Sequence, residues 1–161
     1  MTDALFEDCT IGDDEGSSPH AFFFKMHSNC GNSQAQNSTA FQCRIGDIIV
    51  RNTKLGRIRN NTWQDPGHEG DFAIQMALSY ADPPIIPSLP QPLISNISFI
   101  NVTATETIKV AHITGSINKV GGLHFRDCNF HATSHDPWSL RKVDVSSCSS
   151  TNSLPPFPVQ Y

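Results

Sequence analysis

A short alternation of apolar and polar positions recurs along this chain. Each copy reads apolar, any residue, Asn or Asp, any two residues, apolar, and the copies cover residues 6–11, 50–55, 99–104 and 125–130. A fainter fifth copy at 145–148 keeps a small polar residue and the cysteine. The first four copies begin 44, 49 and 26 residues apart. These spacings predict coils of about 25 residues, with one coil between the last two copies and two coils between each earlier pair.

The segments around these copies are short runs of β-branched and aromatic residues, interrupted by Asn, Gly, Ser and Pro. Such runs predict strands and not helices. Further strands are expected at 21–26, 72–80 and 108–114, between the copies. In the first of them Phe22 and Phe24 share one face and Phe23 points to the other. Strands that repeat in this way predict an all-β parallel β-helix, in which stacked coils bury a continuous apolar column.

Composition indicates one globular domain over residues 1–161. The chain is 38% hydrophobic and 16% charged, which argues against disorder. A proline-rich loop is expected at 81–92 and an extended tail at 152–161. The formal charge of −4, without a basic stripe, argues against nucleic acid or an anionic membrane as partner. No apolar run approaches the roughly 20 residues of a membrane span.

Sequons and cysteines indicate that the parent protein is secreted. N-glycosylation is expected at up to four acceptors, Asn37, Asn60, Asn96 and Asn101. The five cysteines suit an oxidising environment, and the pairs Cys30–Cys43 and Cys128–Cys148 are the expected disulfides. Cys9 is then a buried small residue or has lost a partner upstream. No Cys/His cluster suggests a metal site. Because the chain begins inside a repeat without a signal peptide, we expect the N-terminal end to be truncated.

Four segments resemble polygalacturonases, the pectin-degrading family 28 glycoside hydrolases. Residues 93–105 (LISNISFINVTAT) are similar to a repeated strand of that family, and 121–130 followed by 138–148 to its closing coils. Residues 24–31 (FKMHSNCG) resemble its Arg-x-Lys segment, and 73–82 (AIQMALSYAD) the strand that ends in a subsite tyrosine. The resemblance covers nearly the whole chain. It implies a right-handed, single-stranded parallel β-helix of about six coils.

The resemblance also implies an activity. The family cleaves galacturonan by inverting acid/base hydrolysis without a cofactor, using carboxylates about 6.5–9.5 Å apart. Lys25 matches the lysine that holds a uronate carboxylate, and Tyr80 matches the subsite tyrosine. Phe23 replaces the arginine, so the bidentate fork for the carboxylate is missing. Asp13 and Asp14 are the candidates for catalytic carboxylates, and the alternative is an acidic surface turn.

Together these observations predict the C-terminal part of a polygalacturonase-like enzyme that acts on pectin, with the isolated 161-residue chain inactive. A non-catalytic, polysaccharide-binding or scaffold β-helix is the alternative, and a uronate lyase that uses Lys25 as base is the third. Trp138 either caps the apolar column or stacks on sugar. An open coil at the N-terminal end would leave strand edges unpaired, so self-association is expected there.

Overall fold

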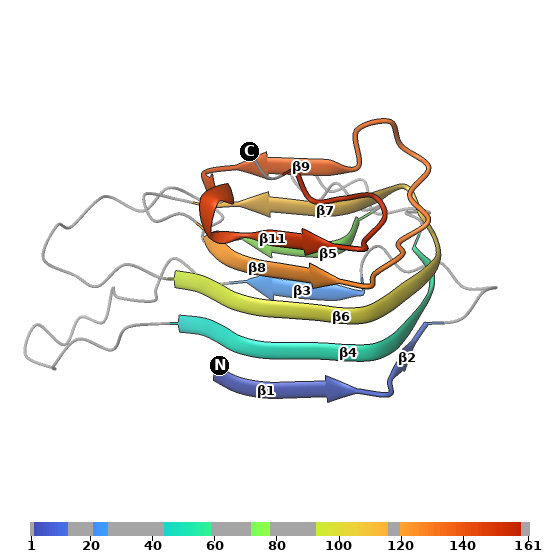
Figure 1. Cartoon of the computed structure of the whole chain (residues 1–161), viewed down its shortest axis with the longest axis horizontal. Helices are drawn as coiled ribbons and strands as arrows, with labels where there is room; N and C mark the ends of the chain where they lie inside the picture. The colour runs from blue at the N-terminus through green and yellow to red at the C-terminus, as the bar shows by residue number, and fades with distance from the viewer. Residues whose placement is uncertain are drawn as a thin grey trace, which may run out of the picture.

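The computed structural model describes residues 2–12, 21–25, 44–58, 72–77, 93–115 and 120–158. They form two parallel sheets (Figure 1). The first sheet follows the order β1 (Thr2–Glu7), β4 (Arg44–Ile58), β6 (Leu93–Thr107), β8 (Val120–Arg126) and β10 (Val143–Asp144). The short strands β2 (Thr10–Ile11) and β11 (Ser149–Thr151) pair with β4 and β8. The second sheet follows the order β3 (Phe22–Lys25), β5 (Phe72–Ala77), β7 (Lys109–Thr114) and β9 (Trp138–Arg141).

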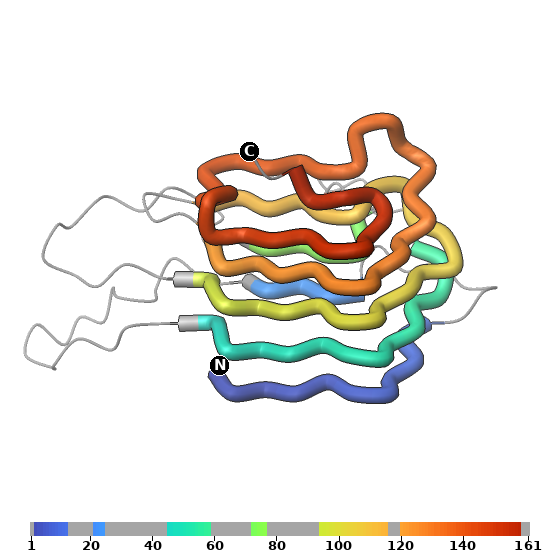
Figure 2. The backbone as a smooth tube through the Cα atoms, in the orientation of Figure 1, coloured from blue at the N-terminus to red at the C-terminus, as the bar shows by residue number. Residues whose placement is uncertain are grey.

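The chain alternates between the two sheets as it advances (Figure 2). A strand of the first sheet is followed by one of the second, and we call such a pair a level. Only a single 3-10 turn, η1 (Val145–Ser147), interrupts the strands among the described residues. All strand pairs are parallel. The expected all-β, parallel architecture is therefore confirmed.

The repeated sequence pattern marks neighbouring strands of the first sheet. Phe6 pairs with Val50, Val50 with Phe99, and Phe99 with Phe125. The expectation of two coils between the earlier copies is therefore wrong, because intervals of 44 and 49 residues each correspond to one level. Among the described strands, the path of the first sheet has five members, where about six coils were expected. The remaining residues of the long intervals fall at 13–20, 26–43, 59–71 and 78–92, outside the described part.

The fifth copy of the pattern was also misplaced. Ser149 pairs with His124, and the Gly122 N–H donates to Ser147 Oγ over 2.8 Å, so Ser147 lies beside Gly122. The residue beside Asp127 is Asn152, whose Nδ2 donates to Asp127 Oδ1 over 3.2 Å. The β11 strand therefore carries the last copy of the pattern, about five residues further along the chain than the sequence indicated.

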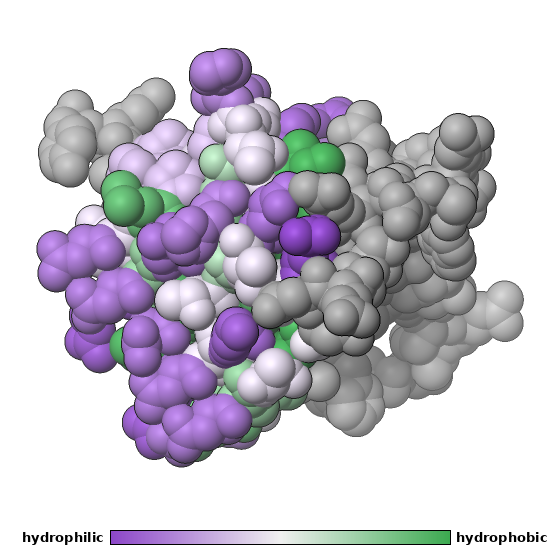
Figure 3. Space-filling model, turned by 90° about the vertical axis from the view of Figure 1, so that its right-hand side faces the viewer, coloured by the Kyte–Doolittle hydropathy of each residue, from purple (hydrophilic) through white to green (hydrophobic). Residues whose placement is uncertain are grey.

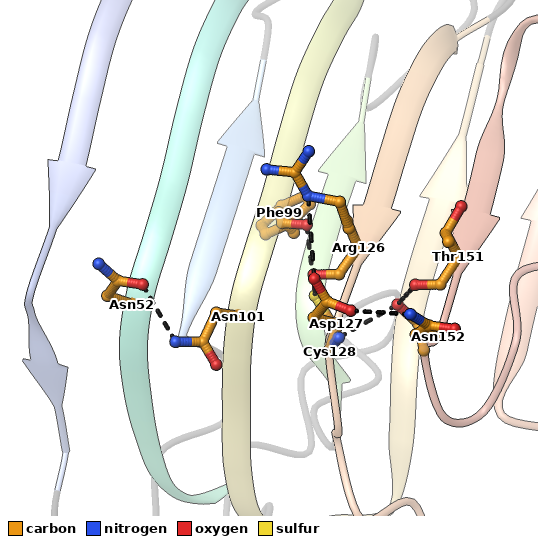
Figure 4. A network of polar contacts seen from close by, with 9 residues as sticks. Asn52, Phe99, Asn101, Arg126, Asp127, Cys128, Thr151 and Asn152 are labelled. Carbon is orange, nitrogen blue, oxygen red and sulfur yellow. Dashed lines mark hydrogen bonds and ion pairs between the residues drawn. The ribbon is translucent and has the colours of Figure 1, made fainter.

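Two ladders of left-handed residues bend the first sheet at fixed points. Positive φ recurs at Asp3, Asp47, Asn96 and Gly122 in one ladder, and at Asp8, Asn52, Asn101, Asp127 and Asn152 in the other. The Asn101 Nδ2 donates to Asn52 Oδ1 over 3.0 Å (Figure 4). In the other ladder the Asn96 Nδ2 donates to Asp47 Oδ1. Asn and Asp tolerate this conformation better than other residues with a side chain. The Asn or Asp of the repeated pattern is thus required by the left-handed backbone conformation at that position.

The space between the sheets is filled by apolar side chains from every level. The fully buried large residues of this core include Ile48, Leu55, Ile74, Met76, Ile94, Phe99 and Phe125. As expected, Phe22 and Phe24 are buried and Phe23 is exposed. Seen from the side, the described surface is mostly hydrophilic, with apolar residues in small separate patches (Figure 3). The core is a continuous column of the kind that the alternation of strand residues predicts.

The C-terminal end of this column is closed by aromatic rings. Phe125 stacks on Phe99 and on Phe157, with ring centroids 5.2 and 5.5 Å apart. Trp138 meets Phe157 edge to face at 4.9 Å and is only 8% exposed. The capping interpretation of Trp138 is therefore confirmed. The described part of the tail is not free, since the Leu154 N–H donates to Cys128 O and Phe157 is 2% exposed.

Candidate functional site

The outer face of the second sheet carries a row of register partners with mostly polar side chains. Gln75 pairs with Phe23 and His112, and His112 pairs with Ser139. Their neighbours Phe24, Met76 and Ile113 point into the core, so side chains of this row point outward. We call Phe23, Gln75, His112 and Ser139 the polar row. Phe23 is 37% exposed, so part of an aromatic side chain reaches the surface at the first position of this row.

His112 is held at both ring nitrogens by hydroxyl groups. Its Nδ1 lies 3.1 Å from Ser139 Oγ, and its Nε2 lies 3.1 Å from Thr114 Oγ1. The ring also packs against Phe72, with centroids 5.1 Å apart. A neutral imidazole donates at one nitrogen and accepts at the other, so one of the two hydroxyls accepts from His112 and keeps its own proton. That hydroxyl can donate to a bound ligand.

A second row, two residues along each strand, begins and ends with a cation. Lys25 pairs with Ala77, Ala77 with Thr114, and Thr114 with Arg141. We call these four residues the cationic row. Arg141 is exposed, and none of the ion pairs found among the described residues involves it. Three strand spacings separate the backbones of Lys25 and Arg141, or about 14 Å.

The second sheet differs in charge from the rest of the molecule. Its four strands contain Lys25, Lys109 and Arg141 and no Asp or Glu. The Lys109 Nζ lies over the Phe72 ring, 5.4 Å from its centroid. The strands of the first sheet mix both signs, and there the Arg51 guanidinium lies 2.6 Å from Glu7 and lowers the pKa of that carboxyl. Since the whole chain has a formal charge of −4, the positive strands of the second sheet stand out.

One buried polar atom of this face has no partner among the described residues. Gln75 is 5% exposed, and none of the described donors reaches its Oε1 within hydrogen-bond distance. A buried acceptor without a donor costs on the order of 1–3 kcal/mol. The polar row therefore contains an amide whose hydrogen-bonding capacity is unused at the centre of the second sheet.

Several residues predicted from the sequence fall outside the described part of the chain. They are Asp13, Asp14, Tyr80, Asn37, Asn60, Cys30 and Cys43, and so the Cys30–Cys43 pairing and the catalytic role of the two aspartates stay predictions. For Lys25 the structure describes the backbone, at the last position of β3. Asn96 and Asn101 are exposed residues of the two ladders, and their glycosylation also stays a prediction.

The expected disulfide between Cys128 and Cys148 is absent. Cys9, Cys128 and Cys148 are all free thiols. The Cys128 N–H donates to Ser153 Oγ, whereas Cys148 comes just before Ser149, which pairs with His124. The two cysteines are thus displaced by about five positions along adjacent strands, roughly 16 Å, and a disulfide requires Cα atoms within about 7 Å. Burial raises the pKa of both thiols, which keeps them protonated and unreactive.

The sequence interpretation missed the partners that organise this face. Thr114, Ser139 and Arg141 were not singled out, and His112 was noted only as a residue of a strand. The available signal was alternation, because each lies next to an apolar residue of its strand that is buried or partly buried. Their alignment could not be read, since intervals of different length separate the strands.

Comparison with known proteins places the chain in no family. A scan against protein-family models gives no match, and neither the curated proteins nor the solved structures contain a significant one. Among the described residues, no group of three or more His, Cys, Asp or Glu side chains is arranged to hold a metal ion. No helix in that part of the chain has the length and apolar character needed to cross a membrane.

Proposed function

We propose that this chain is a right-handed, single-stranded parallel β-helix of the polygalacturonase type that binds an acidic polysaccharide, galacturonan, on its second sheet. The observation that carries the proposal is the charge of the second sheet, whose strands hold three cations and no carboxylate in a chain of charge −4. Ammonium and guanidinium groups pair with carboxylates, and each uronate residue carries one. The alternating sheets and the ladders support the β-helix.

The polar row supplies what a sugar needs besides charge. Hydroxyls of Ser139 and Thr114 can exchange hydrogen bonds with sugar hydroxyls, and the exposed Phe23 ring offers an apolar surface for a pyranose. The resemblance of residues 24–31 to the family's Arg-x-Lys segment gives Lys25 the role of a uronate ligand. In the parent enzyme, the reaction would be inverting hydrolysis without a cofactor.

Binding is the function that the described residues support, because hydrolysis needs two carboxylates on the same face. Neither the polar row nor the cationic row contains one. We therefore propose binding without turnover for the chain as it stands, and secretion for its parent protein. A uronate lyase would instead release an unsaturated product that absorbs ultraviolet light.

Titration calorimetry with tetragalacturonate, and with a neutral galactose tetramer as control, tests the proposal. We expect the uronate to bind with an affinity that falls as salt is raised, and the neutral tetramer to show no heat of binding. Lys25→Gln should weaken uronate binding about fivefold, the effect of losing one ion pair. Equal affinity for both tetramers, or none for either, would overturn the proposal. Release of reducing ends from polygalacturonate would show turnover and contradict the non-catalytic interpretation.

A further inference from the structure

The structure assigns a second cationic anchor to this face: we propose that Arg141 holds a carboxylate of the polysaccharide at the opposite end of the cationic row from Lys25. The inference rests on the proposed function and extends it, because it fixes the direction of the ligand. A chain that touches both cations runs across the strands, from β3 over β5 and β7 to β9.

The position of Arg141 in β9 favours this role. Trp138 is buried and caps the core, so the alternation of the strand turns Ser139 and Arg141 outward together. Ser139 is bound to His112 and thereby linked to Thr114, the register partner of Arg141. Arg141 is thus the register partner of a threonine whose hydroxyl is already positioned by a hydrogen bond.

Competing partners for Arg141 are missing among the described residues. Three arginines of the first sheet are differently placed, since Arg51 lies 2.6 Å from Glu7, Arg57 3.5 Å from Glu106 and Arg126 3.9 Å from Asp127. No described carboxylate is within ion-pair distance of Arg141. An exposed guanidinium that has no ion-pair partner in the described part of the chain can form a bidentate pair with a uronate carboxylate.

Two anchors at opposite ends of one row predict a dependence on ligand length. A short oligomer can satisfy one cation at a time, whereas a longer uronate chain engages Lys25 and Arg141 at once, and the second contact then forms at a high effective concentration. Removal of Arg141 should therefore weaken long oligomers and leave short ones almost unchanged. A ligand that lies along the strands would show no such dependence.

The experiment is a calorimetric series with galacturonate oligomers of two to six sugars on wild type, Arg141→Gln and Lys142→Gln. Lys142 is the matched control, because it is also an exposed cation but lies beyond the end of β9 with positive φ. We expect Arg141→Gln to weaken the hexamer about fivefold and the dimer less than twofold, and Lys142→Gln to change neither by more than twofold.

The outcomes separate this inference from the proposed function. If wild type binds no oligomer, the proposed function fails and the anchor fails with it. If wild type binds and the two variants behave alike at every length, Arg141 is not an anchor although the face still binds uronates. Equal loss at all lengths in Arg141→Gln alone would show that even the dimer depends on Arg141, and this would overturn the direction across the strands. Thermal unfolding of both variants serves as the check that they fold.

Discussion

At the residue scale, the position after each left-handed residue of the second ladder has a recurring role. Cys9, Thr53, Cys128 and Ser153 occupy this position, and each side chain donates to the carbonyl oxygen two residues before it, over 3.0 to 3.3 Å. Val102 fills the same position in β6 without a donor. Two cysteines therefore do here what a threonine and a serine do at other levels. Their sequence pattern reflects the turn and not a disulfide framework.

Replacing these cysteines should then cost little. We expect Cys128→Ser to keep the hydrogen bond to the Arg126 carbonyl oxygen. Cys148 is aligned with the apolar residues Ile48, Ile97 and Leu123 of the other strands, so we expect Cys148→Val to be tolerated there. Each variant should unfold within about 1.5 kcal/mol of wild type in denaturant, the range of volume-conserving core changes. If a disulfide joined the two cysteines, each variant would lose about 2–5 kcal/mol of unfolding free energy, and a reductant would lower the stability of the wild type in the same way. Equal losses of that size would contradict the free thiols.

At the element scale, the strands could be predicted from alternation, but their partners could not. The alternation and type of residues correctly predicted strands at the positions of β3, β5 and β7, and the opposite faces of Phe23 and its neighbours Phe22 and Phe24. The number of levels was wrong, because the sequence does not show whether an interval of 44 residues is one circuit with long connections or two short ones. The polar row depends on that register, so it could not be assembled from the sequence alone.

The C-terminal segment is another element whose role required the structure. A run of prolines around one phenylalanine predicts an extended tail, but Phe157 lies against Phe125 and Trp138 and closes the core. The end of a repeat array needs such a cap, because an open apolar column would face water. The hydrophobic burial of the Phe157 side chain thus outweighs the weak preference of this proline-rich segment for a free, extended conformation.

This cap gives a direct prediction for stability. Phe157→Ala should lower the free energy of unfolding by about 3–5 kcal/mol, since it removes a fully buried aromatic ring. The matched control is Leu154→Ala in the same segment, which should change it by less than about 0.5 kcal/mol because Leu154 is 61% exposed. Urea unfolding followed by tryptophan fluorescence measures both, since Trp138 contacts Phe157. A free tail would instead make the two substitutions equally mild.

At the scale of the whole molecule, stability should vary along the stack of levels. Each strand of the first sheet bonds mainly to the strand before it and the strand after it, so the fold behaves as a one-dimensional array. β6 has paired neighbours on both sides, β4 and β8, whereas among the described strands β1 pairs only with β4. The exposed ion pair between Glu7 and Arg51 adds little to that last contact.

Native-state amide hydrogen exchange should reveal this gradient. We expect the strongest protection in β6 and in the flanking parts of β4 and β8, and the weakest in β1, because the end of an array opens without disturbing the levels beyond it.

The lowered pKa of Glu7 means that its ion pair with Arg51 contributes stability above the ordinary carboxyl pKa of about 4.3, and that this contribution is lost as pH falls through the lowered value. Protection of β1 should therefore decline further in acid. If β1 were as protected as β6, another strand would have to pair with its edge. A rise of that protection with protein concentration would identify the other strand as part of a second copy, in agreement with the self-association expected from the sequence.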